Sequence, residues 1–77
     1  MNNKEYEAYL KKFGSNLRSI RKAKGLSMET IANESEMDYR QYGRIERGEI
    51  NTTIISLLRI SKVLKIELYE LFNLDMD

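Results

Sequence analysis

The fold of this chain is decided by one stretch, LSMETIANESEMDYRQYGRIERGE, which runs from Leu26 to Glu49. It reads as two short helices joined by a brief polar turn. Ser27 is a good N-cap for the first helix. Asp38, followed by Gln41 three residues later, predicts the start of the second helix as a variant of the capping box. Gly48 offers the left-handed residue that ends this second helix.

The second of these helices has an apolar face and a basic face. Tyr42 and Ile45 are three residues apart and therefore lie on the same side of the helix, which we expect to be buried. Tyr39, Arg40 and Arg44 fall on the other side. The sequence therefore predicts a helix that buries its back and presents positive charge outward.

Composition places the chain among small helical domains and excludes several kinds of chemistry. Seventy-seven residues form one domain, which buries only about 60% of the surface that its unfolded chain exposes. Cysteine and histidine are absent, so disulfides, thiolate or imidazole metal sites and the usual nucleophilic triads are excluded. Proline is absent and Leu, Ile and Val are plentiful, which favours an all-α fold. We expect no metal, no cofactor and no small-molecule ligand.

Enzymatic activity is the least favoured function. Paired carboxylates such as Glu34 and Glu36 lie in a polar turn without a companion base or metal ligand, so they are interpreted as solvated charges. No apolar run approaches the ~20 residues needed to cross a bilayer, and the polar start Met1–Lys4 is not typical of a signal peptide. We therefore expect a cytoplasmic protein that has no membrane partner.

Charge is unevenly distributed along the chain. The formal net charge is only +1, which alone does not indicate a nucleic-acid partner. However, Lys11–Lys24 contains six basic residues and no acidic one, whereas every charged residue in 67–77 is acidic. This polarity suits a protein that presents one face to phosphates.

The N-terminal part of the chain predicts a long amphipathic helix. Its apolar residues recur at steps of four, three, four and three, at Tyr6, Leu10, Phe13, Leu17 and Ile20. Gly14 weakens a helix by about 1 kcal/mol relative to alanine, so a break there is an alternative to one continuous helix. We divide the chain into an arm or helix extension (residues 1–12), a helix-turn-helix domain (13–73) and a tail (74–77). The arm residues Tyr6, Tyr9 and Leu10 would cover the edge of the core or pack against another copy of the chain; we favour the covering role.

The C-terminal part predicts two further helices. Thr53 is a candidate N-cap, and Ile50 in the preceding loop is expected to point inward. The next helix should bury one face at helical spacing, made by Leu57, Ile60, Ser61 and Leu64. A short fifth helix should complete the bundle with Ile66, Leu68, Leu71 and Phe72.

The order of these positions resembles the helix-turn-helix of the phage repressor and Cro family, also called XRE-type regulators. The resemblance covers about residues 13–72, and the residues that carry it are Ile31-Ala32, Met37, Tyr42, Ile45 and Arg44–Glu49, flanked by Phe13–Ser27 and Leu57–Leu64. It implies a compact five-helix domain of the lambda-repressor type that binds double-stranded DNA. It also implies a transcription regulator, most simply a repressor, that acts as a homodimer on a palindromic operator.

The resemblance also assigns roles to residues of this chain. Base reading would fall to Tyr39, Arg40, Gln41 and Arg44, since arginine can donate a fork of hydrogen bonds to guanine. Phosphate contacts would come from Ser27, Met28, Arg47, Asn51, Thr52 and Thr53. An ion pair between Arg21 and Glu46 would tie the first helix to the third. Candidates for the dimer surface do not come from the resemblance; they are the apolar residues left over once the core is assigned, namely Ile55, Leu58, Tyr69, Leu74 and Met76.

Three positions depart from the family pattern. Glu36 stands where relatives usually have glycine, Met28 replaces a frequent glutamine, and Asp38 brings negative charge close to the DNA. In addition, Lys65 stands where many relatives have glycine. The alternative function, from another class, is a protein-interaction module such as an antitoxin that uses the same fold to hold a partner protein.

Overall fold

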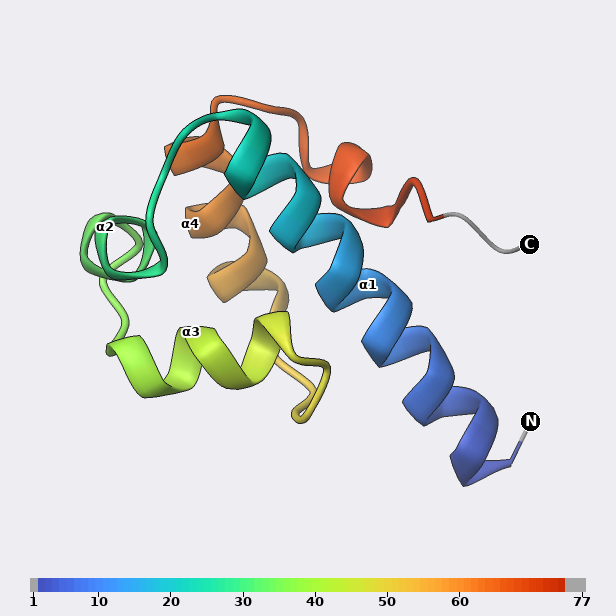
Figure 1. Ribbon diagram of the computed structural model, residues 1–77. Helices are drawn as coiled ribbons and strands as arrows, with labels where there is room; N and C mark the ends of the chain where they lie inside the picture. Colours follow the sequence, from blue (N-terminus) through green and yellow to red (C-terminus); the bar gives the residue numbers. More distant parts are fainter. Residues whose placement is uncertain (1, 75–77) are drawn as a thin grey trace.

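The fold is built from helices around one apolar centre (Figure 1). The computed structural model describes residues 2–74, among which there is no strand. In chain order the elements are α1 (Asn3–Ala23), α2 (Met28–Glu34), α3 (Tyr39–Glu46), α4 (Ile54–Leu64) and the 3-10 helix η1 (Leu68–Phe72). The prediction of an all-α helix-turn-helix domain is confirmed, with α2 and α3 as the two helices of the motif.

The fifth element differs from the expected α-helix. The segment after α4 is a five-residue 3-10 helix that begins at Leu68. Glu67 and Glu70 cap its start reciprocally, and the Asn73 N–H donates to the Glu70 carbonyl, the shorter spacing of a 3-10 turn. The segment therefore closes in tight 3-10 turns instead of forming a regular α-helix.

Side-chain caps set the starts of the three later α-helices. Each cap oxygen accepts a hydrogen bond from the backbone N–H three residues further on, over 3.0 Å at Ser27, 2.8 Å at Asp38 and 3.1 Å at Thr53. All three caps were expected from the sequence and are confirmed. Local chemistry therefore fixes where α2, α3 and α4 begin.

The first helix runs unbroken through Gly14. A Cβ at Gly14 would collide with the Glu46 carbonyl oxygen, and a Cβ at Gly48 would lie 2.7 Å from the Lys11 Cα. The two glycines therefore let the backbone of α1 cross the end of α3 at very short range. This crossing leaves no room for a side chain at position 14, although glycine weakens the helix in which it lies.

The first turns of α1 extend beyond the other helices, as the blue end of the ribbon shows (Figure 1). Residues 2–9 are all exposed, and Tyr6 keeps 54% of its surface in solvent. The covering role expected of the arm therefore applies to Tyr9 and Leu10, which border the apolar pocket described below, and not to Tyr6.

The core lies between α1, the two motif helices and α4. The predicted buried face of α4 is confirmed, and Ile50 packs half-buried against the core as expected. Leu26 packs against the core in the same way. Phe72 remains 52% exposed, so it closes the bundle only by placing its ring 5.2 Å from that of Phe13. The buried apolar residues are Phe13, Leu17, Ile31, Ala32, Tyr42, Ile45, Leu57, Ile60, Leu64 and Leu71.

Two non-glycine residues take up the left-handed backbone conformation. Glu36, in the turn between α2 and α3, and Lys65, after α4, both have φ of 58°. These are the two positions at which the XRE-type pattern that the chain resembles has glycine. Each side chain is tolerated at a cost of about 1–2 kcal/mol.

No helix within residues 2–74 combines the length and the apolar character that a membrane crossing requires.

Candidate nucleic-acid interface

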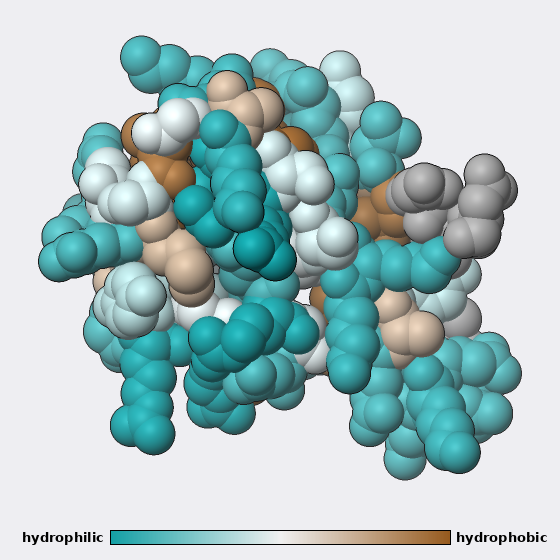
Figure 2. Space-filling model, viewed as in Figure 1, coloured by the Kyte–Doolittle hydropathy of each residue, from teal (hydrophilic) through white to brown (hydrophobic). Residues whose placement is uncertain are grey.

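The outer face of α3 is polar and open to solvent. Tyr39 is 57% exposed, Arg40 and Arg44 are exposed, and Gln41 is half-buried. The surface over α3 is mostly hydrophilic along the lower edge of the molecule (Figure 2). Neither arginine forms an ion pair within the described part of the chain, so both guanidinium groups present their donors outward.

A buried ion pair fixes α3 against α1. Arg21 donates from Nε to Glu46 Oε2 over 2.9 Å and from Nη2 to Oε1 over 2.8 Å. Its Nη1 donates to the Leu26 carbonyl oxygen over 2.9 Å. Both residues are only 7% exposed. This two-point geometry restrains the guanidinium and the carboxylate in one plane, and therefore restrains the angle of α3.

The ion pair shifts the ionisation of both partners. Burial opposes the charge on Glu46, but the hydrogen bonds and positive charges around it, of which the Arg21 hydrogen bond is the largest, together outweigh burial and lower the pKa of the Glu46 carboxyl. The same hydrogen bond raises the pKa of Arg21. Burial raises the pKa of Tyr42, whose hydroxyl is also enclosed on this side of α3. The pair is therefore fully charged at neutral pH.

The predicted phosphate contacts come from three places in the fold. Ser27 and Met28 begin α2, Arg47 follows α3, and the other three, Asn51, Thr52 and Thr53, lie in the loop before α4. Met28 is half-buried, and its methyl carbon lies 3.4 Å from the position of a Cβ on Gly43, so α2 and α3 pack closely there. Ser27 and Thr53 already use their hydroxyl oxygens as helix caps.

The sequence interpretation missed the contacts at the end of α3. The Arg47 guanidinium extends back over Gly43 and also pairs with Glu49 at 2.7 Å. The Lys11 backbone packs on Gly48, two residues after Glu46. Spacing in the sequence does not reveal this cluster, because Lys11 comes from the other end of the chain and the loop residues follow no helical period.

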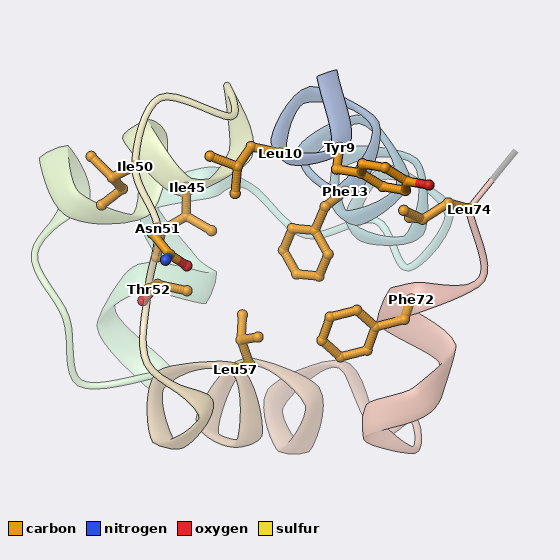
Figure 3. Close-up of a pocket in the computed structure, with 10 residues that line it drawn as sticks. All are labelled: Tyr9, Leu10, Phe13, Ile45, Ile50, Asn51, Thr52, Leu57, Phe72 and Leu74. Atoms are coloured by element: carbon orange, nitrogen blue, oxygen red, sulfur yellow. The ribbon is translucent and has the colours of Figure 1, made fainter. Parts of the chain in front are cut away.

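An apolar pocket lies at the edge between α1, the α3–α4 loop and η1 (Figure 3). Its volume is about 280 Å³. The rings of Phe13 and Phe72 lie close together and tilted relative to each other, with Leu57 from α4 beside Phe72 and with Asn51 and Thr52 on the loop side. Leu74, one of the predicted dimer residues, also lines this pocket.

The other predicted dimer residues lie at the surface to different degrees. Ile55 is 58% and Tyr69 is 72% exposed, whereas Leu58 is half-buried. Met76 lies outside the described residues. Ile54, at 67% exposed, adds apolar surface that was not assigned from the sequence.

The buried face of α3 is fixed by the Arg21–Glu46 pair, and its exposed face carries Arg40 and Arg44. This arrangement is typical of a DNA-binding helix-turn-helix domain. The family model described as Helix-turn-helix (HTH_3) matches residues 17–71, and the chain belongs to this family. The XRE-type resemblance is thereby confirmed, and the chain is a DNA-binding regulator of transcription.

Named relatives narrow this class. The control protein C.MunI from Mycoplasma sp. is 40% identical over 63 residues, covering 80% of this chain and 85% of that protein. The crystal structure of the restriction-modification controller protein C.AhdI from Aeromonas hydrophila is similar with a TM-score of 0.83 and 46% identity, covering 84% of this chain and 98% of that one. An HTH_3 family transcriptional regulator from Vibrio cholerae matches with a TM-score of 0.79 and 28% identity, over 87% of this chain and 38% of that one.

Proposed function

We propose that this protein is a cytoplasmic controller of restriction-modification genes that binds a palindromic operator as a homodimer. The observation that carries the proposal is the outward face of α3, which the Arg21–Glu46 pair holds at one angle. Two relatives named as control or controller proteins support the assignment to restriction-modification genes. An operator that overlaps a promoter would exclude RNA polymerase when occupied, so repression is the proposed outcome.

Base reading is proposed for the N-terminal half of α3. Arg40 and Arg44 are one helical turn apart, so both would reach the same stretch of the major groove and donate to the O6 and N7 of guanines. Tyr39 would contact a thymine methyl group or a phosphate, with Gln41 beside it. The operator half-site should therefore contain guanine.

Backbone contacts would position the reading helix without reading sequence. Ser27 and Met28 would offer the start of α2 to one phosphate. Arg47 and the loop residues would contact the backbone elsewhere along the groove, through Asn51, Thr52 and Thr53. Because such contacts release counterions, binding should weaken steeply as salt is added.

The homodimer is proposed from unpartnered apolar surface. Among the candidate interface residues, Ile55 and Tyr69 are mostly exposed, whereas Leu58 and Leu74 are half-buried. A single small domain buries too little DNA for tight specific binding, so two copies on a palindrome supply the remaining contacts. Met76 is kept as a candidate from the sequence alone.

Selection of bound sequences from a random DNA pool tests the function directly. We expect a palindrome whose half-sites are about one helical turn apart. In fluorescence anisotropy on that operator, Arg40→Ala and Arg44→Ala should each weaken binding by about 5- to 150-fold, since a two-point contact to guanine contributes roughly 1–3 kcal/mol. Arg59→Ala, which removes an exposed arginine from α4, is the matched control. Binding that ignores both α3 substitutions would favour the protein-interaction module instead.

The dimer is tested separately by sedimentation equilibrium of the free protein. Ile55→Ala combined with Tyr69→Ala should shift the protein towards monomer, whereas Tyr6→Ala, which truncates an exposed tyrosine on α1, should not. If the double variant associates as strongly as the wild type, the interface lies elsewhere.

A further inference from the structure

One carboxylate lies among the cations at the end of α3. Glu49 follows Gly48 directly and accepts two hydrogen bonds from Arg47, from Nε over 2.7 Å and from Nη2 over 3.4 Å. About half of each side chain is exposed, 55% for Arg47 and 49% for Glu49. The pair is therefore in contact with solvent and open to exchange with another anion.

Two further cations influence the same carboxylate through their charge. The hydrogen bond from Arg47 lowers the pKa of Glu49, and the positive charges of Arg47, Arg44 and Lys11 act in the same direction. Lys11 is held there because α1 packs directly on Gly48. Glu49 therefore contacts Arg47 and lies in the positive field of groups from α1 and α3.

The space beside these groups is large enough for an oxyanion. Lys11 and Arg47 line the same hollow, of about 380 Å³, between α1 and the end of α3. Ser15 and Arg18 add a hydroxyl and another cation to its wall, which also includes Met28 and the paired side chains of Arg21 and Glu46. Glu49 lies at Arg47, outside this wall. A guanidinium fork binds a phosphate with the same geometry as a carboxylate, and the phosphate of DNA is the anion expected at this end of the reading helix.

We propose that Arg47 and Lys11 form a binding site for a backbone phosphate of DNA, and that the Glu49 carboxylate occupies the place of this phosphate in the free protein. This inference rests on the proposed function. DNA would displace Glu49 from Arg47 on binding. Because an exposed ion pair stabilises a protein only weakly, the exchange has a low cost.

The inference predicts that Glu49 is an internal competitor of DNA. Glu49→Gln should tighten operator binding by roughly two- to fivefold at moderate salt, the range that an exposed ion pair can supply. The salt dependence should become steeper, because more of the positive charge of Arg47 is then neutralised by phosphate. Lys11→Ala should weaken binding and reduce the magnitude of the salt slope by about 0.9. Anisotropy titrations over a salt series measure all three effects.

A double-mutant cycle separates this competition from general charge repulsion. If Glu49 acts through Arg47, the gain from Glu49→Gln should nearly vanish in an Arg47→Ala background. Glu34→Gln removes the same charge at the end of α2 and is the matched control. Glu49→Ala is a second variant, and thermal melts should show that both Glu49 variants fold as the wild type does.

Three outcomes would overturn the inference. Weaker binding by Glu49→Gln would mean that Glu49 orients Arg47 for DNA, and unchanged binding would mean that it plays no part. If the gain in DNA affinity from Glu49→Gln persists in full in the Arg47→Ala background, Glu49 acts only by long-range repulsion of DNA and not through Arg47. If Arg40→Ala and Arg44→Ala weaken binding while Glu49→Gln gives no gain, the proposed function stands and only this inference fails.

Discussion

Removing the charge of Glu46 should destabilise the protein far more than removing any exposed charge. In Glu46→Gln the side chain keeps its shape, but its amide has one oxygen to accept from Arg21 and turns an NH₂ group towards a cation. Loss of one partner of a buried ion pair costs about 3–5 kcal/mol. Arg21 retains its hydrogen bond to the Leu26 carbonyl oxygen, so we expect the lower end, about 3 kcal/mol.

That loss is a large share of the stability of such a small domain, which is about 4–12 kcal/mol at 0.05–0.15 kcal/mol per residue. At about 4–8 °C per kcal/mol, the melting temperature should fall by roughly 12–24 °C. Urea unfolding and thermal melts followed by circular dichroism at pH 7 measure both quantities. DNA affinity should fall as well, because α3 loses the contact that sets its angle.

The pH dependence gives a second, independent check. The pKa of Glu46 is lower in the folded protein than in the unfolded chain. Its contribution is therefore fully present above the unfolded value of about 4.3 and is lost as the pH falls through the folded value. The difference in stability between wild type and Glu46→Gln should be constant above about pH 5 and should narrow in acid.

Controls separate the charge from the packing. Glu49→Gln, in the exposed pair, should leave the melting temperature nearly unchanged. Arg21→Met combined with Glu46→Leu should recover much of the lost stability, since two apolar groups leave no buried charge unpaired. The reasoning is refuted if Glu46→Gln melts within about 4 °C of the wild type at pH 7, less than the shift expected for 1 kcal/mol.

Two further substitutions test the backbone. Gly14→Ala should destabilise the protein by about 1–3 kcal/mol, measured by urea unfolding. Overpacking against the Glu46 carbonyl should outweigh the ~1 kcal/mol that alanine gains over glycine in a helix. A more stable variant would show that α1 and α3 do not approach so closely. Glu36→Gly should stabilise the protein by about 0.5–1 kcal/mol. It removes the ~1–2 kcal/mol cost of a left-handed φ of 58°, but glycine loses more conformational entropy when the chain folds. A less stable variant in the same assay would contradict this account of the turn.

Features set by neighbouring residues could be predicted from the sequence. Ser27, Asp38 and Thr53 cap the helices they were expected to cap, because a cap depends only on an oxygen and an N–H three residues apart. The outward face of α3 follows equally from helical periodicity. Its assignment to base reading came from family resemblance, and the structure shows only that its arginines are accessible.

Features set by distant parts of the chain could not be predicted. Gly14 appeared to be a weak point in a helix, whereas its position is explained by the carbonyl of Glu46, 32 residues away in the sequence. Phe72 had the apolar character of a core residue, but the short 3-10 helix leaves it half exposed. The Arg47–Glu49 pair depends on a loop conformation that has no periodic signal.

The free end of α1 allows its length to vary independently of the rest of the molecule. Residues 2–9 contribute no buried side chain. The backbone of α1 first packs on the turn after α3 at Leu10 and Lys11, against Gly48, and then on the end of α3 at Gly14. Residues before Tyr9 can therefore be removed from this end, or a fused segment attached to it, without disturbing the packing of α1 against α3. The length of α1 can therefore differ between related proteins while the position of α3 in the fold stays the same.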